Sequence, residues 1–222
     1  MDARWSKLIE GLGRYNWLKF DQFKAWLPAR CVLCATPTQG ATLCGTCLRD
    51  LPWRQHSRLR GPAEVHASFH YAFPIVECIG RAKLGGDCGL ARELGRWMAA
   101  RPVVSAQQID VVCAVPQHWR RAIGRGYNQA LEISKPIALA LERPLWTDAL
   151  RRTAGEPQRG LGRSARLRNI AGRMAADARV AGRRLLIVDD VTTTGATFRE
   201  AARALRAAGA ADVVAWAAAA VD

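Results

Sequence analysis

One stretch decides the fold of this 222-residue chain, and it reads Leu185-Leu186-Ile187-Val188-Asp189-Asp190-Val191-Thr192-Thr193-Thr194-Gly195-Ala196-Thr197. Its four leading apolar residues predict a strand that is buried on both faces, as strands of a parallel sheet are. Two carboxylates follow at the expected carboxyl end of that strand, where open α/β sheets bind their ligands. Because Asp189 and Asp190 repel each other, a site that keeps both is expected to offer them a diol or a metal-bound ligand.

The residues after the acidic pair form a candidate phosphate-binding loop. Thr193, Thr194, Gly195, Ala196 and Thr197 lead into a predicted helix. Their backbone N–H groups and hydroxyls, together with the helix dipole, suit a phosphate, and Gly195 allows a tight turn close to the anion. The alternative is a strand, an Asx turn and a threonine-capped helix without a ligand. Capping needs only one such residue, and this stretch supplies several.

Four of the seven cysteines form two closely spaced pairs, Cys31-x2-Cys34-x9-Cys44-x2-Cys47. Two such pairs are typical of a tetrahedral structural Zn²⁺ site. The alternatives are disulfides or free thiols, and disulfides are disfavoured in the cytoplasm, where we expect the protein. Three further cysteines are expected to be ordinary buried residues, namely Cys78, Cys88 and Cys113.

The chain is strongly basic, with 33 Lys and Arg against 19 Asp and Glu, which gives a net charge of +14. Such a charge favours a polyanionic partner such as nucleic acid. Because arginine dominates over lysine, a GC-rich genome is the alternative origin of this charge. Residues 151–184 hold ten arginines against Glu156 and Asp177, and we predict a mobile basic connector there with a helix near 165–170.

The N-terminal segment, residues 1–27, is aromatic and amphipathic and predicts a helix. It packs on its own domain or a partner, or it serves as a stacking or membrane-surface element. The charges that it carries disfavour a signal peptide, and the chain has no apolar run long enough to cross a membrane. We therefore expect a cytoplasmic protein without stable membrane insertion.

Strands and helices alternate along the rest of the chain, as in an α/β domain. Besides the strand that ends at the acidic pair, the pattern predicts strands at 66–73, 110–116, 145–150 and 212–217. It predicts helices at 75–84, at 89–100, from Gln129 to about Glu142, and from the phosphate loop to Ala208. Pro136 is expected to kink the third of these helices.

The acidic pair and its loop resemble the 5-phosphoribosyl-1-pyrophosphate (PRPP) motif of type I phosphoribosyltransferases. From Cys31 onward, the whole layout is similar to the competence protein F (ComF) family. The shared elements are the four-cysteine motif, Lys83-Leu84 before a Gly-Asp turn, Asp110 to Pro116 with His118, Arg125-Gly126-Tyr127-Asn128-Gln129, Gln158 to Leu161 with Arg166 and Asn169, and the PRPP motif. The resemblance implies a zinc module at 28–60 and an α/β type I phosphoribosyltransferase-like domain with a parallel central sheet at 61–222.

The resemblance also implies roles for individual residues. Asp189 and Asp190 would bind the ribose hydroxyls, and Thr193 to Thr197 would bind the 5′-phosphate, with Mg²⁺ bridging the diphosphate and the ribose. The pyrophosphate loop would comprise Val115, Pro116, Gln117 and His118, although His118 could instead cap a helix. The loop that covers PRPP would map to Arg152–Arg166 and supply Gln158 and Arg166, or these would lie in a solvated basic loop. Arg125 and Tyr127 to Gln129 would reach the ligand or fix the next helix.

Three functions are compatible with these features. The first is a PRPP-binding protein that handles single-stranded DNA in bacterial competence or DNA uptake, together with other DNA-uptake proteins. The second is an active phosphoribosyltransferase of nucleoside metabolism with an unknown nitrogenous acceptor, and the third is a PRPP-sensing regulator. The net charge, and the zinc module beside aromatic residues, favour the first. ATP and dinucleotide binding have no support, because the chain contains no P-loop and no GxGxxG.

Overall fold

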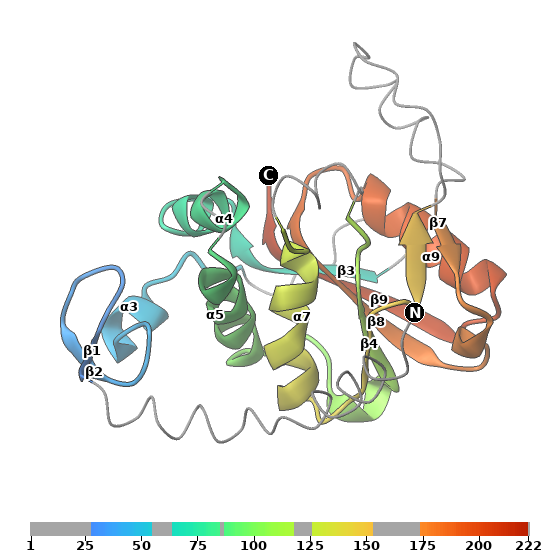
Figure 1. The fold of residues 1–222 in the computed structure, drawn as a ribbon, viewed down its shortest axis with the longest axis horizontal. Coiled ribbons are helices and arrows are strands. Elements are labelled where there is room, and N and C mark those ends of the chain that lie inside the picture. Colours follow the sequence, from blue (N-terminus) through green and yellow to red (C-terminus); the bar gives the residue numbers. More distant parts are fainter. Residues whose placement is uncertain (1–27, 55–63, 85–86, 118–125, 153–173, 222) are drawn as a thin grey trace, which may run out of the picture. The chain divides into compact units, whose positions relative to one another are not determined.

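The computed structural model describes residues 28–54, 64–84, 87–117, 126–152 and 174–221 (Figure 1). The chain divides into two compact units, residues 1–50 and 51–222. The helices expected over 1–27 and near 165–170 lie outside the described residues. No helix in the described part of the chain combines the length and the apolar composition that a membrane crossing requires.

The smaller unit consists of two short strands and one short helix. β1 (Pro28–Arg30) and β2 (Pro37–Gln39) pair antiparallel. α3 (Gly45–Arg49) begins after Cys44, whose thiol accepts a hydrogen bond from the backbone N–H of Cys47 at 3.4 Å. Since α3 has no buried residue, packing alone gives this unit little stability, and small folds of this kind commonly depend on a metal or on disulfides.

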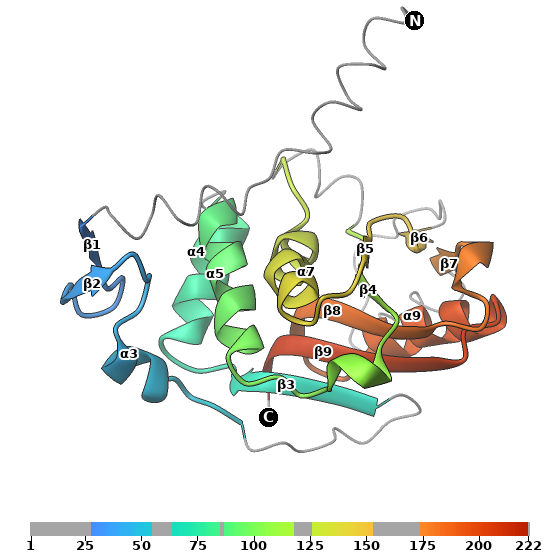
Figure 2. The same ribbon diagram turned by 90° about the horizontal axis from the view of Figure 1, so that it is seen from below.

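The larger unit is centred on a five-stranded parallel sheet with the order β3-β9-β8-β4-β5 (Figure 2). Its strands are β3 (Glu64–His70), β9 (Asp212–Ala220), β8 (Arg184–Thr192), β4 (Val111–Ala114) and β5 (Leu145–Trp146). β8 lies in the middle, and its residues Leu185 to Val188 are completely buried. This confirms the α/β fold with a parallel central sheet that the apolar run predicts.

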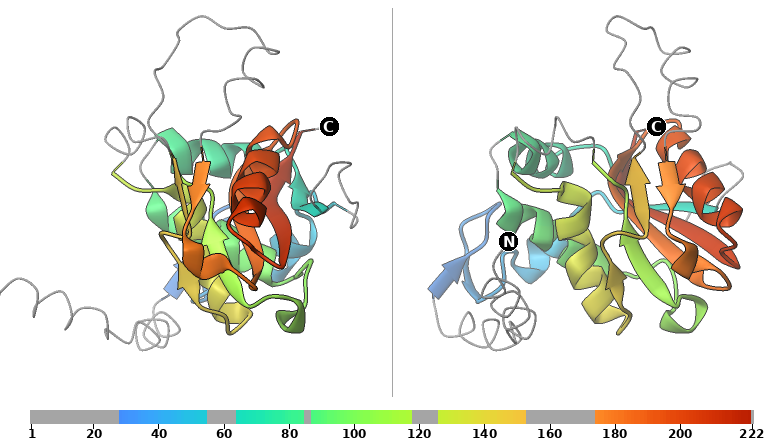
Figure 3. Two further views of the ribbon diagram at one scale, coloured as in Figure 1. Left: turned by 90° about the vertical axis from the view of Figure 1, so that its right-hand side faces the viewer. Right: turned by 45° about the vertical axis from the view of Figure 1, so that its right-hand side comes forward.

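One face of the sheet is covered by α9 (Ala196–Ala207), drawn in red in both views of Figure 3. Phe198, Ala201 and Leu205 of α9 are buried in one hydrophobic cluster with alternate residues of the strands, such as Ile187. Arg203 and Arg206 are exposed on the other side of the helix. Gly209 ends the helix with a φ of 90°, a conformation that glycine adopts without strain.

The opposite face of the sheet carries α5 (Cys88–Ala99) and α7 (Gln129–Ala140), with α4 (Ile75–Leu84) packed on α5 (Figure 2). The two sheet-facing helices meet at Gly95. A Cβ atom on Gly95 would lie 2.2 Å from the carbonyl oxygen of Ile133 and 2.6 Å from Cγ of Pro136. α7 continues across Pro136, so the proline does not end the helix.

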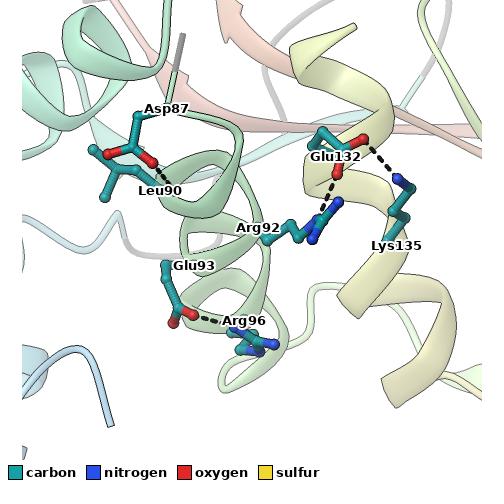
Figure 4. Close-up of polar contacts among 7 residues, drawn as sticks. All are labelled: Asp87, Leu90, Arg92, Glu93, Arg96, Glu132 and Lys135. Atoms are coloured by element: carbon teal, nitrogen blue, oxygen red, sulfur yellow. Dashed lines mark hydrogen bonds and ion pairs between the residues drawn. The ribbon is translucent and has the colours of Figure 1, made fainter. Parts of the chain in front are cut away.

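A polar network links these two helices above their apolar contact (Figure 4). Arg92 of α5 donates from Nε to the Glu132 carboxylate of α7 at 2.6 Å, and Lys135 Nζ lies 2.6 Å from the same carboxylate. Glu93 and Arg96 form a second ion pair along α5, and Asp87 caps the start of that helix by accepting from the N–H of Leu90 at 2.9 Å. Because the basic partners of these ion pairs are partly exposed, the pairs add little to stability.

Two predictions for the region around residue 150 are wrong. The strand expected at 145–150 is divided between β5 and β6 (Leu150–Arg152), and β6 pairs antiparallel with β7 (Met174–Ala176). The connector expected over 151–184 is also regular at both ends, since β7 is followed by a 3₁₀ turn, η2 (Ala178–Val180). Burial of Met174 and Val180 in the core explains this regularity, which the surrounding arginines obscure in the sequence.

Candidate functional site

A pocket of about 460 Å³ lies where β4 and β8 end. It is lined by residues 115–117 after β4, 128–130 at the start of α7 and 189–191 in β8, together with Lys83, Arg152 and Thr197. β4 and β8 are adjacent and parallel, so their carboxyl ends meet at this edge of the sheet. This is the place where open α/β sheets bind ligands, as the sequence of β8 predicts.

The two carboxylates of the pocket have different surroundings. Asp190 is paired with Lys83 at the end of α4, with 3.0 Å between Nζ and Oδ2. Asp189 is half-buried, and its Oδ1 accepts a hydrogen bond from the N–H of Asp190 at 2.9 Å. Burial and the neighbouring Asp190 charge raise the pKa of Asp189 to about 8. At neutral pH Asp189 is therefore largely protonated, and a hydroxyl or cation that favours its ionised form will release a proton on binding.

The loop before α9 has the geometry of an anion site. Gly195 is the N-cap residue and has a φ of 69°, and no side chain caps the helix. The guanidinium of Arg199 fixes this turn by donating from Nη1 to the carbonyl oxygen of Thr194 at 2.6 Å. The first turn of α9 thus presents backbone N–H groups to an anion without competition from a capping side chain. Thr197, in that turn, lines the pocket.

Hydrogen bonds hold the segments on the other side of the pocket. Asn128 caps α7 by accepting from the N–H of Ala130 at 3.1 Å, and its Nδ2 donates to the carbonyl oxygen of Val115 at 3.1 Å. The Tyr127 hydroxyl donates to the carbonyl oxygen of Ala82. Arg152 donates from Nε to the carbonyl oxygen of Pro116 at 2.8 Å. Tyr127 and Asn128 therefore fix the helix and the loop, which was one of the two alternatives for them.

In the smaller unit the four predicted cysteine ligands converge. The Sγ atoms of Cys31, Cys34, Cys44 and Cys47 all lie within 4.8 Å of one another, and none of them forms a disulfide. The Cys34 and Cys44 sulfurs are 3.7 Å apart, close to the edge of about 3.8 Å that four Zn–S bonds of 2.3 Å define. Burial opposes ionisation of the Cys31 thiol, but backbone hydrogen bonds from Cys44, Cys34 and Leu33 lower its pKa to about 6. The cluster could hold a metal ion.

Comparison with known proteins gives the same assignment. A phosphoribosyl transferase domain matches residues 130–221, which include β8, α9 and β9. The DNA utilization protein YhgH of Escherichia coli strain K12 is 33% identical over 194 residues, which are 84% of this chain and 82% of the relative. The chain belongs to the family of these DNA utilization proteins. Competence protein F of Haemophilus influenzae is 29% identical over 182 residues, covering 78% and 76% of the two chains.

Among solved structures, the glutamine PRPP amidotransferase of B. subtilis is similar over 58% of this chain and 26% of its own, with 24% identity and a TM-score of 0.42. A similarity of this level carries no argument about function. The family assignment therefore rests on the YhgH relatives, which confirm the resemblance to the ComF family inferred from the motifs.

In this ComF-family protein the structure brings part of the predicted site together. Asp189, Asp190 and Thr197 line one pocket with three of the four residues expected in the pyrophosphate loop, Val115, Pro116 and Gln117. Thr193 to Ala196 lead into α9 next to it. The remaining three candidates lie outside the described residues, namely His118, Gln158 and Arg166.

The pocket also contains residues to which sequence reasoning assigned no role or an ambiguous one. Lys83 and Arg152 bring positive charge to it from two distant elements, and Gln129 lines it from α7. Lys83 has a signal in the sequence, because it precedes the Gly-Asp turn of the family pattern. Arg152 is only the first residue of the loop that the resemblance places over PRPP, and it is one of ten arginines in a basic stretch. The pairing of β6 with β7 is what singles it out.

Proposed function

We propose that the protein binds PRPP with Mg²⁺ and acts in bacterial DNA uptake or utilisation, where it handles single-stranded DNA. One observation carries the first part. The acidic pair of β8, the uncapped start of α9 and the residues after β4 belong to one site at the carboxyl edge of the sheet. A ribose that carries a phosphate at one end and a diphosphate at the other matches these three groups.

In this proposal each segment binds one part of the ligand. Asp189 and Asp190 accept hydrogen bonds from the ribose hydroxyls, and residues 193–197 bind the 5′-phosphate through backbone N–H groups and hydroxyls. Residues 115–118 face the diphosphate. Two adjacent carboxylates beside a diphosphate also fit Mg²⁺, which prefers oxygen ligands and binds through one or two carboxylates and substrate phosphates. Mg²⁺ would neutralise the charge of the diphosphate.

The role in DNA handling is supported by the relatives and by the charge of the chain. The relatives are named for DNA utilization and for competence. The chain carries 33 basic against 19 acidic residues, and a basic surface supplies most of the affinity of non-specific DNA binding. We expect single-stranded DNA and other DNA-uptake proteins to be its partners, and we expect the protein to act in the cytoplasm.

We further propose that the metal of the four-cysteine cluster is Zn²⁺, since four cysteine thiolates at this spacing are the typical ligands of structural zinc. Because the ligands gather only in the folded state, metal binding contributes to folding. Cys44→Ser should unfold the smaller unit, as followed by proteolysis, and remove the zinc that elemental analysis is expected to find at one per chain. Cys88→Ser, at a half-buried position in the larger unit, should leave the zinc in place. Protein that folds fully without zinc would contradict this assignment.

The PRPP proposal is tested by isothermal titration calorimetry with PRPP and Mg²⁺. Replacement of both aspartates by alanine should abolish binding of PRPP. The circular dichroism spectrum should stay unchanged, because the buried residues of β8, Leu185 to Val188, precede the two aspartates and are kept. Glu77→Ala removes an exposed carboxylate of α4 and serves as the control. Equal affinities of the double variant and the wild type would refute the proposal.

The raised pKa of Asp189 favours a second candidate, an active phosphoribosyltransferase. A carboxyl that ionises near neutral pH is suited to accept a proton from a nitrogenous acceptor. Exchange of labelled pyrophosphate into PRPP in the presence of candidate bases would detect the transfer. A protein that binds PRPP without exchange would be a binding protein or a sensor.

A further inference from the structure

Lys83 lines the pocket but has no role in the function proposed above. Its Nζ lies 3.0 Å from Oδ2 of Asp190, and the two side chains are 29% and 14% exposed. Solvent and salt screen a partly buried ion pair of this kind less than they screen a pair on the surface. Asp190 is one of the two carboxylates to which we assign the ribose and the metal. A cation of the protein itself therefore already occupies one oxygen of that carboxylate.

The fold fixes the position of this lysine at the end of α4. The preceding residue, Ala82, is fully buried, and its carbonyl oxygen accepts a hydrogen bond from the Tyr127 hydroxyl. Tyr127 in turn precedes Asn128, which caps α7 and donates to the carbonyl oxygen of Val115. The end of α4 is thus tied to the opposite wall of the pocket. Lys83 reaches Asp190 from a backbone that is held in place.

The charges that line the pocket balance. Among the described residues that line it, Lys83 and Arg152 are basic, and Asp189 and Asp190 are acidic. A divalent cation that entered alone would bring its charge to a site without net negative charge, next to an ammonium group on the same carboxylate. Like charges a few ångströms apart repel each other strongly, even near a protein surface. A ligand with phosphate groups would supply the negative charge that the metal needs.

We propose that Lys83 keeps the acidic pair from binding a divalent cation by itself, so that Mg²⁺ enters only together with an anionic sugar phosphate. The inference rests on the proposed function, in which PRPP is that ligand. Lys83 acts through Asp190 and is therefore a positioning residue. Its ammonium group compensates Asp190 in the ligand-free protein, and the phosphate groups of the ligand compensate the metal when both arrive.

The test is a titration of the ligand-free protein with Mn²⁺, which binds the same oxygen ligands as Mg²⁺. Electron paramagnetic resonance measures the Mn²⁺ that stays unbound. Lys83→Met keeps an unbranched side chain and removes the charge, so this variant should bind Mn²⁺ roughly 10-fold more tightly than the wild type. Asp190→Asn, added to Lys83→Met, should abolish the gain. A lysine with only a structural role could not produce it, because a loosened fold binds metal less well.

Lys135 provides the matched control. Its side chain is also 29% exposed, and its Nζ lies 2.6 Å from the carboxylate of Glu132 on the same helix. Lys135→Met changes the net charge of the chain by the same amount and should leave the Mn²⁺ affinity unchanged. An equal gain in this variant would show a general effect of net charge and overturn the inference. Unchanged or weaker Mn²⁺ binding by Lys83→Met would overturn it as well.

Calorimetric titration of the wild type with PRPP and Mg²⁺ separates this inference from the proposed function. If the wild type binds PRPP while Lys83→Met shows no gain in Mn²⁺ affinity, only the role of Lys83 is wrong. If Lys83→Met shows the gain but the wild type binds no PRPP, the exclusion of free metal by Lys83 stands and PRPP is the wrong ligand.

Discussion

The chemistry of the site depends most on Asp189, which lies next to Asp190 in β8, with Lys83 of α4 beside the pair. The lysine lies 3.0 Å from Asp190, so it compensates one of the two carboxylates directly. Asp189 is left half-buried beside a like charge, and its pKa is raised to about 8. A residue with such a pKa reduces the stability of the empty protein at neutral pH and becomes favourable only with a ligand.

The dependence of stability on pH follows from this shift. The native state keeps the Asp189 proton up to about pH 8, whereas the unfolded chain loses it near pH 4, so this residue lowers stability as pH rises between the two values. Asp189→Asn cannot ionise and should remove that decline. By pH 7 this decline extends over about three pH units, so the variant should be more stable by up to about 4 kcal/mol, since one unit is about 1.4 kcal/mol.

Urea unfolding at pH 5, 6, 7 and 8 measures this difference between the wild type and Asp189→Asn. Asp212→Asn, at the exposed start of β9, is the control for the loss of a carboxylate. Parallel profiles for the wild type and Asp189→Asn would show that Asp189 has an ordinary pKa.

At the scale of elements, the crossing of α5 and α7 supports the wall of the pocket from which Gln129 comes. Gly95→Ala would place a Cβ atom 2.2 Å from the Ile133 carbonyl oxygen, and a backbone atom cannot move aside alone. The helices must separate, which should cost about 1–3 kcal/mol in chemical unfolding. Gly80→Ala in α4, with nothing within 4 Å of the added atom, should instead be neutral or slightly stabilising.

The same contact shows what a sequence can predict at this scale. Leu185 to Val188 predict a buried strand because four apolar residues leave few other possibilities, and the acidic pair that follows predicts a site. Gly95 and Pro136 give no comparable signal, because their importance arises from a contact between two helices. Likewise β9 extends to Ala220, beyond the predicted end at Ala217, because alanine is a weak hydrophobic signal.

The polar residues of the pocket also divide into those that the local sequence predicts and those that only the fold brings together. Asp189 and Thr197 are close in sequence and could be assigned together, whereas Lys83, Gln129 and Arg152 meet them only through the fold. Trp53 is an aromatic residue next to the zinc module, but it is half-buried. Its ring packs 4.6 Å from the ring of Phe69, and the Arg101 guanidinium lies 4.4 Å from it. Hydrophobicity alone cannot tell such a residue from an exposed one.

At the scale of the whole molecule, DNA binding depends on which charges and aromatic rings are accessible. Several arginines of residues 151–184 are already engaged, since Arg179 pairs with Asp148 and Asp177 and Arg184 pairs with Asp110. Fewer than ten are therefore available to phosphates. After β3, Phe73 is 76% exposed and Tyr71 is 39% exposed, so these rings are better placed to stack on bases than Trp53.

Binding of a fluorescent single-stranded oligonucleotide at several salt concentrations tests this. Replacement of Arg163, Arg166 and Arg168 by alanine should reduce the log–log salt slope by up to about 2, because each neutralised phosphate contributes about 0.7. Phe73→Ala should weaken binding by roughly 1–3 kcal/mol at every salt concentration without changing the slope.

The matched control for the aromatic ring is Leu139→Ala, at an apolar residue of α7 that is 46% exposed. It should leave both the affinity and the slope unchanged. If none of these changes affects binding, the positive charge of the chain is an effect of genome composition and not of DNA binding.

The central claim is that the acidic pair of β8 binds the two hydroxyls of a phosphoribosyl group. Calorimetry with ribose 5-phosphate and with 2-deoxyribose 5-phosphate tests it most directly, because the two ligands share the phosphate and differ by one hydroxyl. Loss of a hydrogen bond to a charged group is worth about 1.5–3 kcal/mol, so the deoxy compound should bind roughly 10- to 100-fold more weakly. The Asp189→Ala, Asp190→Ala double variant, which should not bind PRPP, should bind neither sugar detectably. Equal affinities of the wild type for the two sugars would contradict the account.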